Sequence, residues 1–89
     1  MADIEITSSG VRELRVQVRD SGQVTTHQVT VPPQVEGVEL PDDLERVVRE
    51  SFGFLLEREP ASSILSQFSL GEISRYFPEY PDELARRLA

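Results

Sequence analysis

Apolar and polar residues alternate strictly along residues 14–19, which read L-R-V-Q-V-R. This period of two predicts a β-strand with one buried face. Residues 20–23 (D-S-G-Q) are a turn signal, and residues 24–31 are rich in Val and Thr, which favour strands. If residues 21–22 form a two-residue hairpin loop, one face of the hairpin collects Leu14, Val16, Val18, Val29 and Val31. A slip of one residue would mix polar side chains into this face, so its burial fixes the register.

A second alternation marks residues 3–7 (D-I-E-I-T), and residues 8–10 (S-S-G) can form a turn. We therefore expect a first strand here, with Ile4 near Leu14. The three strands together predict an antiparallel meander over residues 1–33. Because an isolated meander is only marginally stable, its apolar face needs a cover from the rest of the chain.

Prolines divide the rest of the chain into segments. The pair Pro32-Pro33 ends the last strand, because proline cannot donate a hydrogen bond to a strand ladder. Residues 34–40 then form an acidic connector, whose valines either add a short edge strand or pack on the sheet. Residues 41–59 predict one long helix, which stops at Pro60 because the residue before a proline avoids the helical region. Residues 60–89 predict two or three short helices.

Two of the predicted helix starts carry capping signatures. Asp42 followed by Glu45 resembles a capping box at the start of the long helix. Ser69 followed by Glu72 matches the same motif and predicts a helix boundary at Ser69. A last helix is expected to start at Pro81, with acidic residues in its first turn and arginines in its last turn, as the helix dipole prefers.

The apolar positions of the long helix cover a wide arc. At about 100° per residue they spread over about 200°, roughly twice the stripe of an ordinary surface helix. They are Leu44, Val47, Val48, Phe52, Phe54, Leu55 and Leu56. One face of a sheet cannot cover so wide an arc. We therefore expect either the later helices or a second copy of the protein to lie against it.

These elements predict an α+β fold in a single domain of residues 1–89. It consists of a three-stranded antiparallel meander packed against one long helix and two or three short C-terminal helices. The 38% hydrophobic and 28% charged content of the chain is typical of a globular domain. An apolar run long enough for a transmembrane helix is absent, and the first residues lack the order of a signal peptide. We therefore expect a cytoplasmic protein without a membrane contact.

The charge of the chain narrows the choice of partners. Sixteen acidic residues oppose nine arginines, lysine is absent, and the net charge is −7. Such a chain repels phosphate backbones and anionic membranes at long range, so nucleic acid is not the expected partner. The single histidine, His27, falls on the apolar strand face without an acidic partner or companion ligands. We expect it to be half-buried, with its ring edge at solvent or at a backbone group.

Motifs for catalysis are missing from the sequence. It contains no phosphate-binding glycine loop, no nucleophile motif, no metal-ligand cluster and no Cys. We therefore expect no catalytic residue, no cofactor and no metal site. The acidic pairs Asp42-Asp43 and Asp82-Glu83 lie at predicted helix starts, where capping and the helix dipole explain them. An enzyme that uses an unrecognised pair of carboxylates remains as a second alternative function.

Four aromatic residues gather in residues 68–80, F-S-L-G-E-I-S-R-Y-F-P-E-Y, and three interpretations compete for them. They can be core that covers the spare arc of the long helix. They can be a docking surface, because large aromatics anchor protein interfaces. Residues 69–89 also have the layout of a helix-turn-helix. The acidic residues at the start of its second helix would repel DNA. We therefore keep DNA binding only as an alternative to a protein-interaction role.

Residues 58–80, R-E-P-A-S-S-I-L-S-Q-F-S-L-G-E-I-S-R-Y-F-P-E-Y, resemble the C-terminal part of small uncharacterised bacterial proteins. The resemblance covers under a third of the chain and brings no activity with it. It implies a bacterial, cytoplasmic protein that stands alone as a short gene product. We predict a non-catalytic protein-interaction or regulatory module that binds an unknown protein partner and self-associates as a homodimer. The expected contact residues are Phe54, Leu56, Tyr76 and Tyr80.

Overall fold

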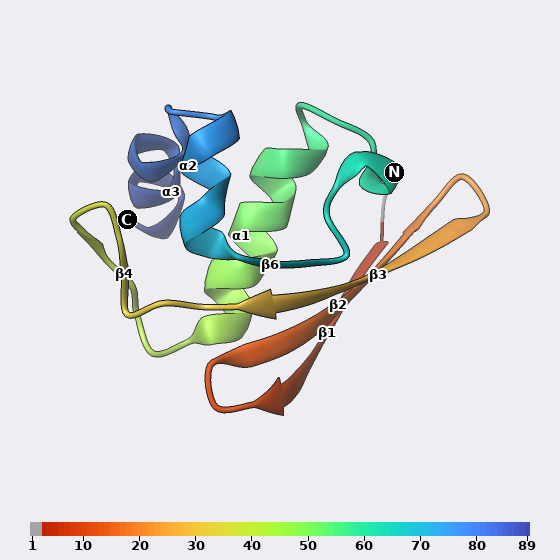
Figure 1. The fold of residues 1–89 in the computed structure, drawn as a ribbon, viewed down its shortest axis with the longest axis horizontal. Coiled ribbons are helices and arrows are strands. Elements are labelled where there is room, and N and C mark those ends of the chain that lie inside the picture. The colour runs from red at the N-terminus through yellow and green to blue at the C-terminus, as the bar shows by residue number, and fades with distance from the viewer. Residues whose placement is uncertain (1–2) are drawn as a thin grey trace.

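Three antiparallel strands form the meander that the alternation predicts. The computed structural model describes residues 3–89, in which β1 (Asp3–Gly10), β2 (Glu13–Asp20) and β3 (Gln23–Thr30) follow one another across a sheet. A short fourth strand, β6 (Gln67–Ser69), pairs in parallel with the edge of β3. The helices lie over one face of this sheet (Figure 1). The α+β class and the three-stranded antiparallel meander are thus confirmed, and β6 adds a fourth strand to the sheet that the sequence did not predict.

The hairpin of β2 and β3 has the register that burial of one face requires. Val16 pairs with His27 and Val18 pairs with Thr25, as predicted. Ser21 and Gly22 form the loop with φ angles of 54° and 80°, the left-handed pair of a type I′ turn, whose twist matches that of the strands. All five residues of the predicted apolar face are at most 5% exposed.

The turn between β1 and β2 lies at residues 11–12 and not at residues 8–10, where the sequence predicts it. Because β1 runs on through the predicted turn, Ile4 pairs with Val18 rather than lying near Leu14. This register places the isoleucines of β1 on the core face, where they are partly buried. Burial of that face outweighs the local turn preference of S-S-G.

The acidic connector folds into a small hairpin of its own. Its strands, β4 (Gln34–Val35) and β5 (Val38–Glu39), form a separate two-stranded sheet. Glu36 and Gly37 turn between them with φ angles of 43° and 86°. Val35 is 1% exposed, so the hairpin anchors to the core through this valine instead of extending the main sheet.

The predicted long helix is α1 (Leu44–Leu56), which is shorter than residues 41–59. Its N-cap is Asp43 rather than Asp42, because the Asp43 Oδ1 accepts a hydrogen bond from the Arg46 backbone N–H at 3.2 Å. The chain leaves the helix after Leu56, several residues before the proline.

The wide apolar arc of α1 is covered by the same chain. Phe54 is fully buried, and its ring centroid lies 5.8 Å from that of Phe77 and 5.2 Å from that of Tyr80. The Arg58 guanidinium lies 3.7 Å from the centre of the Phe54 ring, within the range of a cation–π contact. The expectation that the later helices cover this arc is therefore confirmed, and a second copy is not needed to shield it.

Short elements fill the rest of the chain. They are η1 (Ala61–Ser63), β6, η2 (Leu70–Glu72), α2 (Ile73–Tyr76) and α3 (Tyr80–Leu88). The predicted capping box is present: the Glu72 carboxylate accepts from the Ser69 backbone N–H at 2.8 Å, and the Ser69 hydroxyl oxygen accepts from the Gly71 N–H at 3.3 Å. The helix therefore begins where the sequence predicts it, although its first turn is a 3₁₀ turn.

Candidate functional site

The four predicted contact residues do not form one surface. Phe54 and Tyr80 have no exposed area, Leu56 is partly buried against the core, and Tyr76 is 67% exposed. A side chain with no exposed area cannot touch a partner of the folded chain. Phe54 and Tyr80, which were expected to be contact residues, therefore lie in the core, and Tyr76 is the one of the four with a largely exposed side chain.

Tyr80 is buried because it is the first residue of α3, and the first turn of this helix packs against the core. Its hydroxyl lies 2.7 Å from the Ser51 hydroxyl, which itself donates to the Val47 carbonyl at 2.8 Å. The proton of Ser51 is thus used, and the Tyr80 hydroxyl is the donor to Ser51. Burial raises the pKa of Tyr80 to about 12, because the phenolate would lose its hydration there.

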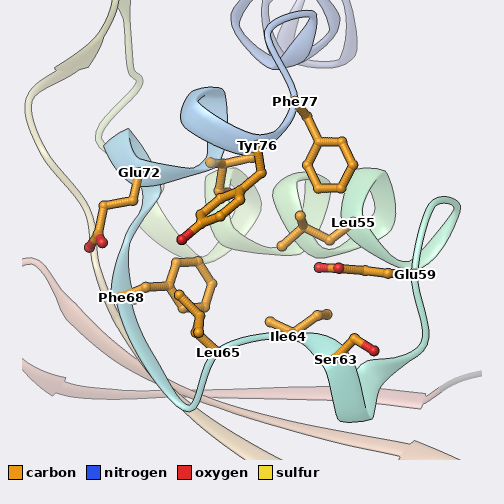
Figure 2. A pocket seen from close by; sticks show the side chains of 10 residues that line it. Leu55, Glu59, Ser63, Ile64, Leu65, Phe68, Glu72, Tyr76 and Phe77 are labelled. Atoms are coloured by element: carbon orange, nitrogen blue, oxygen red, sulfur yellow. The ribbon is translucent and has the colours of Figure 1, made fainter.

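An apolar pocket of about 270 Å³ opens beneath the exposed ring of Tyr76. Figure 2 shows that Tyr76 and Phe77 lie on one side of the pocket and Leu65 and Phe68 on another. Leu65 is 49% exposed, so two large side chains at this site remain in contact with solvent. The full lining comprises Leu55, Glu59, Ser63, Ile64, Leu65, Phe68, Glu72, Ile73, Tyr76 and Phe77.

The wall that carries Leu65 is fastened to β3 by the only histidine. His27 is 2% exposed, and its Nδ1 lies 2.8 Å from the Leu65 carbonyl oxygen while its Nε2 lies 2.9 Å from the Thr25 hydroxyl. A carbonyl can only accept, so Nδ1 carries a proton, and in the neutral ring Nε2 accepts from the Thr25 hydroxyl. His27 therefore reaches a backbone group as predicted, but it is buried rather than half-buried. Its contacts position the pocket wall.

Two carboxylates line the pocket, and they differ in their partners. Glu72 accepts the Ser69 N–H in the capping box, and its carboxylate points away from the pocket centre in Figure 2. The carboxylate of Glu59 points across the pocket between Leu55 and Ile64. Within residues 3–89, Glu59 has no side-chain hydrogen bond and no ion pair. Partial burial raises the pKa of Glu59.

Parts of the helix pair of residues 69–89, which has the layout of a helix-turn-helix, are buried or paired within the chain. The start of α3, where a recognition helix would contact bases, is anchored in the core by Tyr80 and Pro81. The Arg87 guanidinium lies 2.7 Å from a carboxylate oxygen of Glu57, and Arg86 lies 2.8 Å from Glu83. The basic groups at the end of α3 are thus already paired with acids of the chain.

The structure also bears on a metal site and on a membrane-spanning helix. No group of three or more His, Asp or Glu side chains within residues 3–89 is arranged to hold a metal ion. Over the same residues, the helices are too short or too polar to cross a membrane.

Sequence reasoning missed Glu59 and Leu65 as pocket residues. Leu65 lies in the segment predicted to be helical, but the chain leaves η1 in an extended conformation at Ile64, and this exposes the leucine. Glu59 carries no local signal, because its position in the pocket depends on segments that are distant in sequence. Comparison of this chain with protein-family models, with curated proteins and with solved structures gives no match.

Proposed function

We propose that this chain is a small protein-interaction module that binds a partner protein through the pocket beneath Tyr76. The partner inserts a large apolar side chain, which contacts Leu65 at the rim and the rings of Phe68 and Phe77 inside. The observation that carries this proposal is the apolar pocket of about 270 Å³ with two exposed large side chains beside it. Interfaces concentrate their binding energy in anchors of this kind.

The pocket supports a protein partner better than a second copy of the chain. Self-association was expected from the apolar arc of α1, and that arc is now covered by Phe77 and α3. The exposed apolar groups that remain near one another, Leu65 and Tyr76, occupy a concave site. A concave apolar site fits a protruding side chain of a partner.

The proposal is tested with four forms of the protein: wild type, Leu65→Ser, Tyr76→Ser and the control Val24→Ser. Val24 is 53% exposed, close to the 49% of Leu65, but it lies on β3 and does not line the pocket. Each form is immobilised and incubated with extract of the source cell. Captured proteins are identified by mass spectrometry, purified and titrated against all four forms.

We expect a purified partner that binds wild type and Val24→Ser with equal affinity and binds both pocket variants about tenfold or more weakly, since burial of one large apolar side chain is worth about 1.5–3 kcal/mol. Partners that bind all four forms equally would place the interface elsewhere and refute the proposal, as would the absence of any partner.

A further inference from the structure

Glu59 stands out among the carboxylates near the end of α1. Glu57 lies 2.7 Å from Arg87, and Glu79 lies 3.3 Å from Arg58. Glu59 is close to Glu57 in the chain, yet no cation of residues 3–89 comes within ion-pair distance of it. Its carboxylate instead points over the apolar side chains of the pocket (Figure 2).

The Glu59 carboxylate is partly buried in the free protein. Apolar neighbours remove part of its hydration, and no donor group of residues 3–89 hydrogen-bonds to it in exchange. The raised pKa of Glu59 has this single cause, burial. A cation brought in by a partner would supply both the missing charge and the missing donor, and would favour the ionised carboxylate.

We propose that the pocket binds a partner segment in which an arginine or lysine accompanies the large apolar side chain, and that this cation pairs with Glu59. This inference rests on the proposed function and specifies the chemistry of the partner. The aliphatic stem of the basic residue can lie along Leu55 and Ile64, with its charged end at the carboxylate, as long basic side chains do on apolar surfaces. The rings of the pocket favour a cation as well.

The charge of the whole chain favours the same partner. A net charge of −7 attracts a basic segment at long range and repels phosphate-bearing ligands. Glu72 is placed less well to pair with this cation, because its carboxylate points away from the pocket centre in Figure 2. An acidic or neutral segment would leave Glu59 without a partner in a site that binding makes drier.

The test uses random twelve-residue peptides displayed on phage and selected against the wild-type protein. Selected peptides are synthesised and titrated against wild type, Leu65→Ser, Tyr76→Ser, Glu59→Gln and the control Val24→Ser, with thermal unfolding of each variant recorded to confirm that it folds. We expect the binders to combine a large apolar residue with a nearby Arg or Lys. We expect Glu59→Gln to weaken them about tenfold or more, and Val24→Ser to leave them unchanged.

A charge exchange completes the test. For a peptide with the expected pattern, Glu59→Arg is expected to abolish binding, and replacing the basic residue of the peptide by Glu is expected to restore it. Binders that depend on Leu65 and Tyr76 but lack a basic residue, or that bind Glu59→Gln as well as wild type, would overturn this inference and leave the proposed function standing. Failure to obtain any binder that depends on the pocket would count against both.

Discussion

The hydrogen bond between Ser51 and Tyr80 joins α1 to α3 and can be measured with a double-mutant cycle. Both side chains have no exposed area. In Tyr80→Phe, Ser51 keeps its own donated bond to the Val47 carbonyl, and one accepted bond is lost. We expect this variant to lose about 1 kcal/mol of the free energy of unfolding, the net value of one hydrogen bond.

The reverse substitution, Ser51→Ala, has a different consequence. It leaves the Tyr80 hydroxyl buried without an acceptor, which costs about 1–3 kcal/mol, while the higher helix propensity of Ala returns about 0.5 kcal/mol. The double variant removes the orphaned hydroxyl. We therefore expect it to be about 1 kcal/mol more stable than the sum of the two single changes predicts, because the residues are in contact.

Urea unfolding followed by far-ultraviolet circular dichroism gives the four free energies, provided that the m-value stays constant across the cycle. The control is Tyr76→Phe, whose exposed ring predicts a change within about 0.5 kcal/mol. If the costs of the two single changes add to within about 0.3 kcal/mol, the hydroxyl groups are not coupled. The hydrogen bond between Tyr80 and Ser51 would then be refuted.

Tyr80 also makes the free energy of unfolding depend on pH in the alkaline range. Because burial raises the pKa of Tyr80 to about 12 from the ordinary value of 10.0, the folded state keeps the phenol proton to a higher pH than the unfolded state does. The contribution to stability is complete below about pH 10 and is lost as the pH rises through about 12, and it amounts to about 3 kcal/mol. We expect the wild type to lose stability over this range and Tyr80→Phe to lose less, in urea unfolding at matched pH.

Two further predictions concern the ends of the helices. A hydrogen bond from the Arg87 guanidinium lowers the pKa of Glu57. A hydrogen bond from Arg86, with the charge of Arg87 nearby, lowers the pKa of Glu83. These carboxylates therefore stabilise the fold above the ordinary pKa of 4.5 and cease to do so as the pH falls through their lowered pKa values. Arg87→Met should make the melting temperature depend less steeply on pH in the acidic range. An unchanged pH dependence would contradict this ion-pair network. Ser69→Ala removes the side-chain half of the capping box and should cost about 1 kcal/mol in urea unfolding, whereas the exposed control Ser66→Ala should stay within about 0.5 kcal/mol. Equal losses in these two variants would argue against the cap.

The meander could be predicted because its pattern has a period of two and one face must be buried. The β2–β3 register follows from this requirement alone, down to the pairing of Val16 with His27. The turn at residues 11–12 could not be predicted, because nothing in V-R is typical of a turn, and Arg12 has a left-handed φ of 57°. Its guanidinium donates to the carbonyls of Val31 and Pro32 at 2.7 and 2.8 Å, which are tertiary contacts invisible to local pattern analysis.

The width of the apolar arc on α1 correctly predicted that another part of the chain packs against it. It did not predict which side chains this packing would bury. A helical projection gives directions around one axis and says nothing about the partner on each side. Phe54 therefore looked like a contact residue, whereas its ring is enclosed by Phe77, Tyr80 and Arg58. Strand β6 was missed for a related reason: its three residues become a strand only by pairing with the edge of β3.

The pocket depends on these tertiary contacts, and they also bear on the binding that we propose for it. The wall that carries Leu65 is tied to β3 twice, through His27 and through the Gln28 N–H, which donates to the Ser66 carbonyl at 2.8 Å. The opposite wall starts from the capping box of Ser69. Because both walls are fixed by hydrogen bonds before any partner arrives, little main-chain ordering remains to oppose binding. A partner would have to order the exposed side chains at the rim, which costs conformational entropy. Their contact with the apolar residue of the partner has to offset this cost.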